Sequence, residues 1–131
     1  MMGNATPDLD ERGLPAGYAF KPEHEITPRE AHTLVGAKRA ALLDCRTLRE
    51  WEAARIDGAT LLPMPEIESR LDEVRELVED GRELIVHCHH GMRSLRVTLM
   101  LRALGVSPVR SMAGGIDLWS RTVDPTVPRY A

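Results

Sequence analysis

The chain has 131 residues, of which 43% are hydrophobic and 28% charged, and this balance suits one globular domain with its own core. The net charge of −3 gives no electrostatic footprint for nucleic acid, and no apolar run approaches the roughly 18 residues that a membrane span needs. The first residues lack the apolar core of a signal peptide, and Cys45 and Cys88 are too few for a disulfide framework. A cytoplasmic protein without nucleic-acid or membrane partners is therefore expected.

The first part of the chain predicts a tail, a helix and a strand. Residues 1–25 are polar and interrupted by proline and glycine, which is typical of a tail or of a segment wrapped over a surface. Thr27-Pro28-Arg29-Glu30 has the pattern of a capping box with proline at the first helical position, so a helix is expected to begin there. Residues 40–43 predict a buried strand that ends at Asp44.

Further strands and helices alternate along the rest of the chain. Residues 66–80 carry apolar side chains at helical spacing with acidic ones between them, which predicts an amphipathic helix. Residues 84–87 predict a fully buried strand, and 94–104 are apolar almost all round, as in a well-covered helix. The other expected elements are a helical turn at 48–55 anchored by Trp51, strands at 59–62 and 109–112, a turn at Gly114-Gly115, and a helix at 116–122 with Trp119 in the core.

Strands that alternate with helices through short loops predict an α/β fold, with a central parallel β-sheet flanked by helices on both faces. In such folds ligands bind beyond the carboxyl ends of the strands. Asp44, Cys45 and Cys88 all stand at that place in the expected sheet.

Cys88 lies between a buried strand and a helix, joined by the short loop 89–93. If the loop curls around the sulfur, backbone N–H groups and the N-terminus of the helix point at it. Arg93 adds a positive charge, Gly91 permits a tight backbone, and Ser94 can cap the helix or hydrogen-bond the sulfur. Such surroundings lower a cysteine pKa from about 8.5 to between about 3.5 and 7.5, so a thiolate is expected at neutral pH.

Two other interpretations of this loop exist. Free cysteine is often a small buried hydrophobe, but that role needs neither the glycine nor the arginine that follow Cys88. A metal site would draw on His87, Cys88, His89 and His90. Alternation along the strand sends His87 and Cys88 in opposite directions, and four consecutive residues cannot easily surround one zinc ion, so no metal is expected.

Four segments of the chain carry a recognisable combination of residues. They are Leu42-Leu43-Asp44-Cys45-Arg46 followed by Glu50-Trp51, then Ile56-Asp57-Gly58-Ala59, then the loop from His87 to Ser94, and finally Met112-Ala113-Gly114-Gly115-Ile116 with Trp119. In this order they resemble the rhodanese family of single-domain sulfurtransferases. The resemblance implies one rhodanese-like domain over residues 26–122, with tails at 1–25 and 123–131.

The resemblance also implies a thiosulfate-type sulfurtransferase that acts through a persulfide on Cys88. The thiolate takes the outer sulfur of a small anionic donor and passes it to a thiol, to cyanide or to a partner protein, without a metal or an organic cofactor. Cys88 and Arg93 are the expected catalytic residues, Arg93 as the main electrostatic stabiliser. The expected substrate-binding residues are His89, His90, Gly91, Met92 and Ser94.

Two other functions are compatible with this architecture. One is a binding or relay module that takes sulfur from a protein such as a desulfurase. The other is a cysteine phosphatase or arsenate reductase, whose loop is one residue longer between cysteine and arginine. Here only the residues from His89 to Met92 intervene, which tightens the loop to about the size of a persulfide sulfur.

Three residues beside the expected loop have open roles. Asp44 and Arg46 resemble an Asp-x-Arg signature of the family and are expected to be mainly structural, with Arg46 paired to Glu50 or lining the mouth of the pocket. Cys45 stands where a valine is usual in the family. It either fills that place as a small apolar residue or attacks a Cys88 persulfide to form a disulfide.

Overall fold

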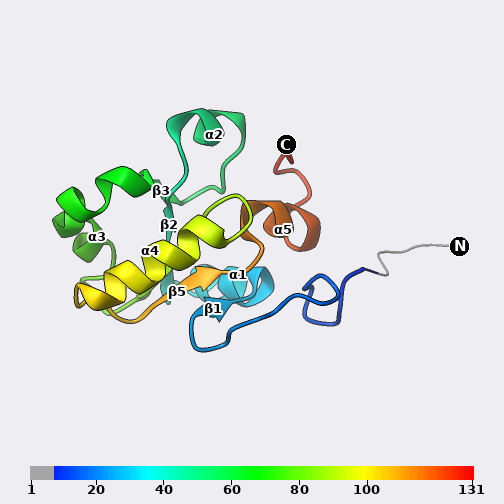
Figure 1. Cartoon of the computed structure of the whole chain (residues 1–131), viewed down its shortest axis with the longest axis horizontal. Coiled ribbons are helices and arrows are strands. Elements are labelled where there is room, and N and C mark those ends of the chain that lie inside the picture. The colour runs from blue at the N-terminus through cyan, green and yellow to red at the C-terminus, as the bar shows by residue number, and fades with distance from the viewer. Residues whose placement is uncertain (1–7) are drawn as a thin grey trace, which may run out of the picture.

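The computed structural model describes residues 8–131 and contains a five-stranded sheet (Figure 1). All neighbouring strands are parallel, in the order β1-β5-β4-β2-β3. This is the α/β fold that the alternation of strands and helices predicts. The strands are β1 (Glu25–Ile26), β2 (Ala40–Asp44), β3 (Thr60–Leu61), β4 (Glu83–His87) and β5 (Val109–Met112).

The central strands β2 and β4 end at the same level of the sheet. Their last register pair is Asp44 opposite His87, and the Cys45 N–H donates to the His87 carbonyl oxygen over 3.1 Å. Cys45 and Cys88, the next residue of each strand, therefore lie side by side at the carboxyl edge. Because side chains alternate along a strand, both point to the same face, where they belong to one buried cluster.

Helices α1 (Pro28–Gly36) and α5 (Gly115–Thr122) cover the other face of the sheet. The α1 helix begins as predicted, because Thr27 and Glu30 make both hydrogen bonds of a capping box. Trp119 is buried, as predicted. The core on this face includes Ile26, Ala31, Leu42, Ile85, Met112, Ile116 and Trp119.

Helices α3 (Leu71–Leu77) and α4 (Met92–Ala103) cover the face to which Cys45 and Cys88 point. The α4 helix begins two residues before the predicted start, because Gly91, with φ of 107°, turns the chain directly into it. The core on this face includes Leu43, Val74, Leu84, Val86, Val97 and Leu101.

The α4 helix is covered less completely than its apolar sequence predicts. Leu99 is 44% exposed, because the sheet covers one side of the helix and solvent the other. At 12 residues α4 is the longest helix in residues 8–131, and no helix in that range has the length and apolarity that a bilayer crossing requires.

The segment 66–80 also differs from the single amphipathic helix that the pattern predicts. It consists of the 3-10 helices η1 (Met64–Glu66) and η2 (Glu68–Arg70), followed by α3. Arg70 interrupts the segment, because its backbone leaves the helical conformation with ψ of 33°. Ile67 and Val74 are nevertheless buried, so the pattern identified the correct apolar side.

Helix α2 (Leu48–Ala53) lies beyond the carboxyl edge of the sheet (Figure 1). None of its side chains is fully buried. Its start is fixed by a capping box between Thr47 and Glu50. Trp51, which the sequence places in the core, is only partly buried. The Arg55 guanidinium covers it, 5.2 Å from the ring centroid.

Residues 8–25 pack against the sheet and α5. Leu14 is buried with Ala113 and Leu118, and Tyr18 and Phe20 pack against the same cluster. Residues 8–25 therefore pack on the surface of the domain, and residues 1–7 of the predicted tail lie outside the described residues.

Candidate active site

Cys88 follows β4 directly, and a short loop leads from it into α4. Gly91 is the N-cap of α4 in a left-handed conformation, and a Cβ there would lie 3.2 Å from the Gly114 nitrogen. Glycine is therefore needed for the loop to turn this tightly. The loop folds over Cys88, which is 1% exposed.

Groups from this loop and from α4 surround the Cys88 sulfur. The backbone N–H groups of Gly91 and Ser94 donate to it over 3.1 and 3.3 Å, and the Ser94 hydroxyl oxygen lies 3.4 Å away. Ser94 does not cap the helix. Its hydroxyl oxygen also lies 3.2 Å from the Gly91 carbonyl oxygen and 2.7 Å from the Ser111 hydroxyl, so its single proton has the Cys88 sulfur among its possible acceptors. The sulfur thus lies where a negative charge is stabilised.

The Cys45 thiol contributes to the same stabilisation. The pKa of the Cys88 thiol lies well below its usual range, first because Cys45 hydrogen-bonds to it and then because of the donors from Ser94 and Gly91, which together outweigh burial. The pKa of Cys45 is raised by the same hydrogen bond and by burial. Cys88 is therefore the thiol of the pair that ionises first.

Arg93 forms a two-pronged ion pair with Glu50 of α2. Its Nη1 and Nη2 groups donate to the two carboxylate oxygens over 2.7 and 2.8 Å, and the Tyr130 hydroxyl donates to the same carboxylate over 2.7 Å. The predicted pairing of Arg46 with the Glu50 side chain is wrong, since Arg46 reaches only the Glu50 carbonyl oxygen, at 3.3 Å. The ion pair uses two of the five N–H groups of the Arg93 guanidinium.

A hollow of about 220 Å³ opens over the loop. Met92 is 73% exposed and stands at its mouth, whereas the sulfur lies at its base. The hollow is lined by Cys88, His89, His90, Met92 and Arg93, all of which the sequence assigns to the site.

Three rings are stacked beside this hollow. The ring centroids of His90 and His89, and those of His89 and Tyr130, are each 3.9 Å apart, and His89 Nε2 lies 3.0 Å from the Tyr130 carbonyl oxygen. Burial lowers the pKa of His89, so its ring is neutral at pH 7. Burial raises the pKa of Tyr130 to about 12, so its hydroxyl remains a donor. The C-terminal segment is thereby attached to the site.

The start of α5 holds the loop from its other side. The Ile116 N–H donates to the Cys88 carbonyl oxygen over 2.8 Å, and the Asp117 N–H donates to that of His89 over 3.2 Å. Gly115 permits this approach, because its φ is 62° and a Cβ would overlap both carbonyl groups. The turn predicted at Gly114-Gly115 is present, and close contact with the loop is its second role.

Asp44 and Arg46 are completely buried, on the opposite face of the sheet from the sulfur. The Arg46 Nε and Nη2 groups donate to the two carboxylate oxygens of Asp44 over 2.9 and 2.6 Å. Arg46 also donates to the Ala54 carbonyl oxygen over 2.6 Å and to the Tyr130 hydroxyl over 3.0 Å. The pair joins β2 to the end of α2 and to the C-terminal segment, and it does not line the hollow.

Glu50 and Tyr130 are parts of the site that the sequence pattern does not assign to it. The capping box of Thr47 and Glu50 predicts where a helix begins. It does not predict that the Glu50 carboxylate also binds Arg93. A signal for Tyr130 does exist, because an aromatic residue in a polar terminal segment is unusual in a chain with only 4% aromatic residues.

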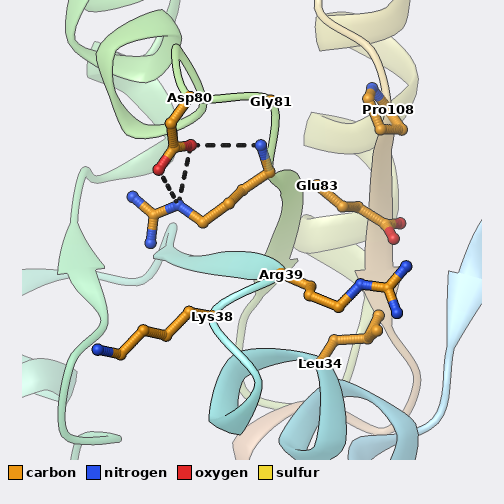
Figure 2. A pocket seen from close by; sticks show the side chains of 8 residues that line it. Leu34, Lys38, Arg39, Asp80, Gly81, Glu83 and Pro108 are labelled. Carbon is orange, nitrogen blue, oxygen red and sulfur yellow. Dashed lines mark hydrogen bonds and ion pairs between the residues drawn. The ribbon is translucent and has the colours of Figure 1, made fainter.

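A larger hollow, of about 380 Å³, lies at the amino ends of β2 and β4 (Figure 2). Arg82 Nε donates to Asp80 over 3.0 Å, and Glu83 accepts from Arg110 over 2.9 Å, so these charges are paired. Its lining offers no thiol, hydroxyl or imidazole group, and the hollow over Cys88 is therefore the candidate active site. The lining residues are Leu34, Lys38, Arg39, Asp80, Gly81, Arg82, Glu83 and Pro108.

The sequence and the fold of this chain are similar to those of known proteins. The model of the rhodanese-like domain matches residues 27–122. The probable adenylyltransferase/sulfurtransferase MoeZ of Mycobacterium tuberculosis is 33% identical over 106 residues, which are 80% of this chain but only 26% of that protein. Human thiosulfate:glutathione sulfurtransferase is 32% identical over 101 residues, covering 69% of this chain and 87% of that protein. The solved structure of the human single domain sulfurtransferase TSTD1 has a TM-score of 0.65 at 29% identity, covering 75% of this chain and 96% of that one.

Proposed function

This chain belongs to the rhodanese family, and on that premise we propose that it is a sulfurtransferase that carries a sulfane sulfur on Cys88. The proposed donor is a small anion of the thiosulfate type, and the proposed acceptor is a thiophile, either cyanide or a thiol. The proposal rests mainly on one observation: the backbone N–H groups of Gly91 and Ser94, at the start of α4, donate hydrogen bonds to the Cys88 sulfur. The human relative is named for thiosulfate and glutathione, which supports these substrate classes.

In the proposed first step the Cys88 thiolate attacks the outer sulfur of the donor. The S–S bond of thiosulfate breaks, sulfite leaves with the electron pair, and Cys88 is left as a persulfide. The thiolate is the nucleophilic form of cysteine, so the hydrogen bonds that lower the pKa of Cys88 supply the reactive species.

In the proposed second step the acceptor attacks the outer sulfur and the Cys88 thiolate is restored. The buried Sγ remains with its N–H donors while the outer sulfur extends into the hollow, where an acceptor reaches it. Neither step requires a metal or an organic cofactor. A reducing compartment such as the cytoplasm is the proposed location, because Cys88 must return to a thiolate in every cycle.

Arg93 is the proposed electrostatic stabiliser of the donor anion. Glu50 fixes the guanidinium beside the hollow, and the N–H groups that Glu50 does not occupy remain for the donor. In this proposal His89, His90 and Met92 shape the entrance, and Gly91 and Ser94 hold the sulfur. Asp44 and Arg46 have a structural role, joining β2 to α2 and to the C-terminal segment.

Intact-mass analysis after incubation with thiosulfate tests the proposal. The wild-type chain should gain one sulfur atom, mapped to Cys88 and removed by cyanide, and Cys88→Ser should gain none. Transfer by Cys88→Ser, or a persulfide at another residue, would reject Cys88 as the carrier. Turnover of an aryl phosphate at a rate comparable to sulfur transfer would instead favour a cysteine phosphatase.

A relay between proteins is a second candidate function, favoured by one observation. MoeZ, named as an adenylyltransferase/sulfurtransferase, contains the matching segment as about a quarter of its length, so a segment of this kind occurs within a larger protein. Transfer of sulfur to Cys88 from a desulfurase much faster than from thiosulfate would favour the relay. Efficient loading from thiosulfate alone would favour a free-standing enzyme.

A further inference from the structure

Cys45 is a second thiol at the site, and the proposed transfer does not use it. It follows β2 as Cys88 follows β4, one position beyond the register pair of Asp44 and His87. The hydrogen bond from the Cys45 N–H to the His87 carbonyl oxygen continues the hydrogen bonding between β2 and β4 as far as the two cysteines. Both side chains lie in the cluster that contains Leu43 and Val86, so they occupy one face of two adjacent strands.

This placement is compatible with the spacing that a disulfide requires. Neighbouring strands lie about 4.8 Å apart, and the Cα atoms of bridged cysteines usually lie about 4.4–6.8 Å apart. The two side chains leave adjacent strands on the same face and lie in one buried cluster, so they converge. Both thiols are free.

The two thiols differ in what can reach them. Both cysteines are 1% exposed, but only Cys88 is among the residues that line the hollow. An acceptor from solvent therefore approaches the outer sulfur of a Cys88 persulfide from the hollow. Cys45 faces the inner sulfur, Sγ, from within the core.

Taking the proposed function as given, we infer that Cys45 resolves the Cys88 persulfide and releases its outer sulfur as hydrosulfide. The Cys45 sulfur attacks Cys88 Sγ, and a bond forms between the two cysteine sulfurs. The bond between Cys88 Sγ and the outer sulfur breaks, and the outer sulfur leaves with the electron pair and the proton of Cys45. The two cysteines are oxidised to a disulfide, the sulfane sulfur is reduced to sulfide, and no further oxidant is required.

The hydrogen bonds of the site support this direction of attack. While Cys88 is a bare thiolate, Cys45 stays protonated beside it, since its pKa is raised. Loading a sulfur moves the negative charge to the outer atom and leaves Sγ as an electrophilic divalent sulfur. Cys45 then brings both the nucleophile and the proton that the leaving sulfide takes. A dithiol reductant must open the disulfide before Cys88 can be loaded again.

The test compares wild type with Cys45→Ser and Cys45→Val after loading with thiosulfate in the absence of oxygen and acceptor. Once the donor is removed, wild type should lose its added sulfur, release one sulfide per chain, and end two hydrogen atoms lighter than the reduced chain. Both variants should keep the persulfide at least about tenfold longer, a barrier difference of about 1.4 kcal/mol. Cys45→Ser retains a hydrogen-bond donor beside Sγ, and Cys45→Val matches the size of the site.

The result separates this inference from the function on which it rests. A wild-type persulfide that lasts as long as that of Cys45→Val, without sulfide release, would overturn the role of Cys45 and leave the sulfur carrier intact. Failure of all three chains to gain sulfur would overturn the proposed function and the inference with it.

Discussion

The Arg93 guanidinium and the Glu50 carboxylate bind each other through two hydrogen bonds of 2.7 and 2.8 Å, although 43 positions separate them in the chain. Glu50 belongs to α2, which buries no side chain of its own. The ion pair therefore ties α2 to the start of α4, directly after the loop that follows Cys88. The position of the charge beside the hollow depends on a residue outside that loop.

Glu50→Gln should lower the free energy of unfolding by about 1–2 kcal/mol near pH 7, because a neutral amide replaces a charged acceptor. Arg93 and, less strongly, the Tyr130 hydroxyl lower the pKa of Glu50 below its usual range. A lowered carboxyl pKa stabilises the fold above the unfolded-state value, about 4.3, and this contribution is lost as pH falls through the folded-state value.

Urea unfolding at neutral pH and at about pH 3 measures this effect, and the difference between wild type and Glu50→Gln should shrink in acid. Glu52→Gln, which changes an exposed carboxyl on the same helix, is the control and should have little effect at either pH. A Glu50→Gln difference that is the same at both pH values would contradict the ion-pair explanation.

Gly115→Ala should disrupt both stability and sulfur transfer. A positive φ costs alanine about 1 kcal/mol, and overlap with the Cys88 and His89 carbonyl groups should add about 1–3 kcal/mol. Gly58→Ala is the matched control, since Gly58 has φ of 88° and open space around it. Chemical denaturation and a thiosulfate:cyanide assay compare the two. Equal losses would show that backbone conformation alone, and not contact with the loop, makes Gly115 necessary.

Local patterns account for most of the fold. The capping box at Thr27 and Glu30 and the apolar runs of β2 and β4 each specify an element through neighbouring residues, and all three are present. The helix predicted at 66–80 was not found as one element because apolar spacing reports which side faces the core. It does not report whether each backbone N–H bonds four or three residues back.

The candidate site divides in the same way. The donors from Gly91 and Ser94 come from the loop and the helix that follow Cys88, so its own sequence indicates them. The contact of Tyr130 with Glu50 joins residues 80 positions apart, and no local pattern encodes it. The pairing of Cys45 with Cys88 lies between these cases, because it follows from strand register, which becomes known only once the sheet is assembled.

Ser94→Ala should raise the pKa of Cys88 by about one unit, equivalent to about 1.4 kcal/mol, because it removes a group that stabilises the thiolate. A higher pKa reduces the thiolate fraction most in acid, so alkylation by iodoacetamide should slow at acidic pH and change little at alkaline pH. Ser111→Ala is the control, since Ser111 contacts the Ser94 hydroxyl and has no bond to the sulfur. An unchanged pH profile for Ser94→Ala would contradict this role.

Arg46→Met should destabilise the protein by about 3–5 kcal/mol, because it leaves the completely buried Asp44 carboxylate without its partner. The double variant Asp44→Leu/Arg46→Met removes both charges and should be more stable than Arg46→Met alone. Denaturation of wild type, Arg46→Met, Asp44→Leu and the double variant gives the coupling between the residues. A double variant that loses the sum of both single effects would argue against a direct ion pair.

His87 offers a separate test of how the buried charges of this fold respond to pH. Its ring is 0% exposed, and within the described residues neither ring nitrogen has a hydrogen-bond partner. The nearest carboxylate oxygen, on Asp44, is 3.7 Å from Nε2, and Arg46 and Cys88 are the other charged groups that act on the ring. Burial lowers the pKa of His87, so the folded protein keeps the ring neutral where the unfolded chain would protonate it.

Since the unfolded chain binds this proton below about pH 6.5, wild-type stability should fall as pH drops from neutral, by up to about 1.4 kcal/mol per pH unit from this group. His87→Leu fills a similar volume without a titrating group, so its stability should fall less between about pH 7 and 5. This window lies above that of Glu50, which separates the two effects in one series of urea titrations. Parallel stability curves for wild type and His87→Leu would mean that His87 is protonated to the same extent in the folded and unfolded chains. The Asp44 carboxylate, 3.7 Å away, would then have to stabilise the buried imidazolium.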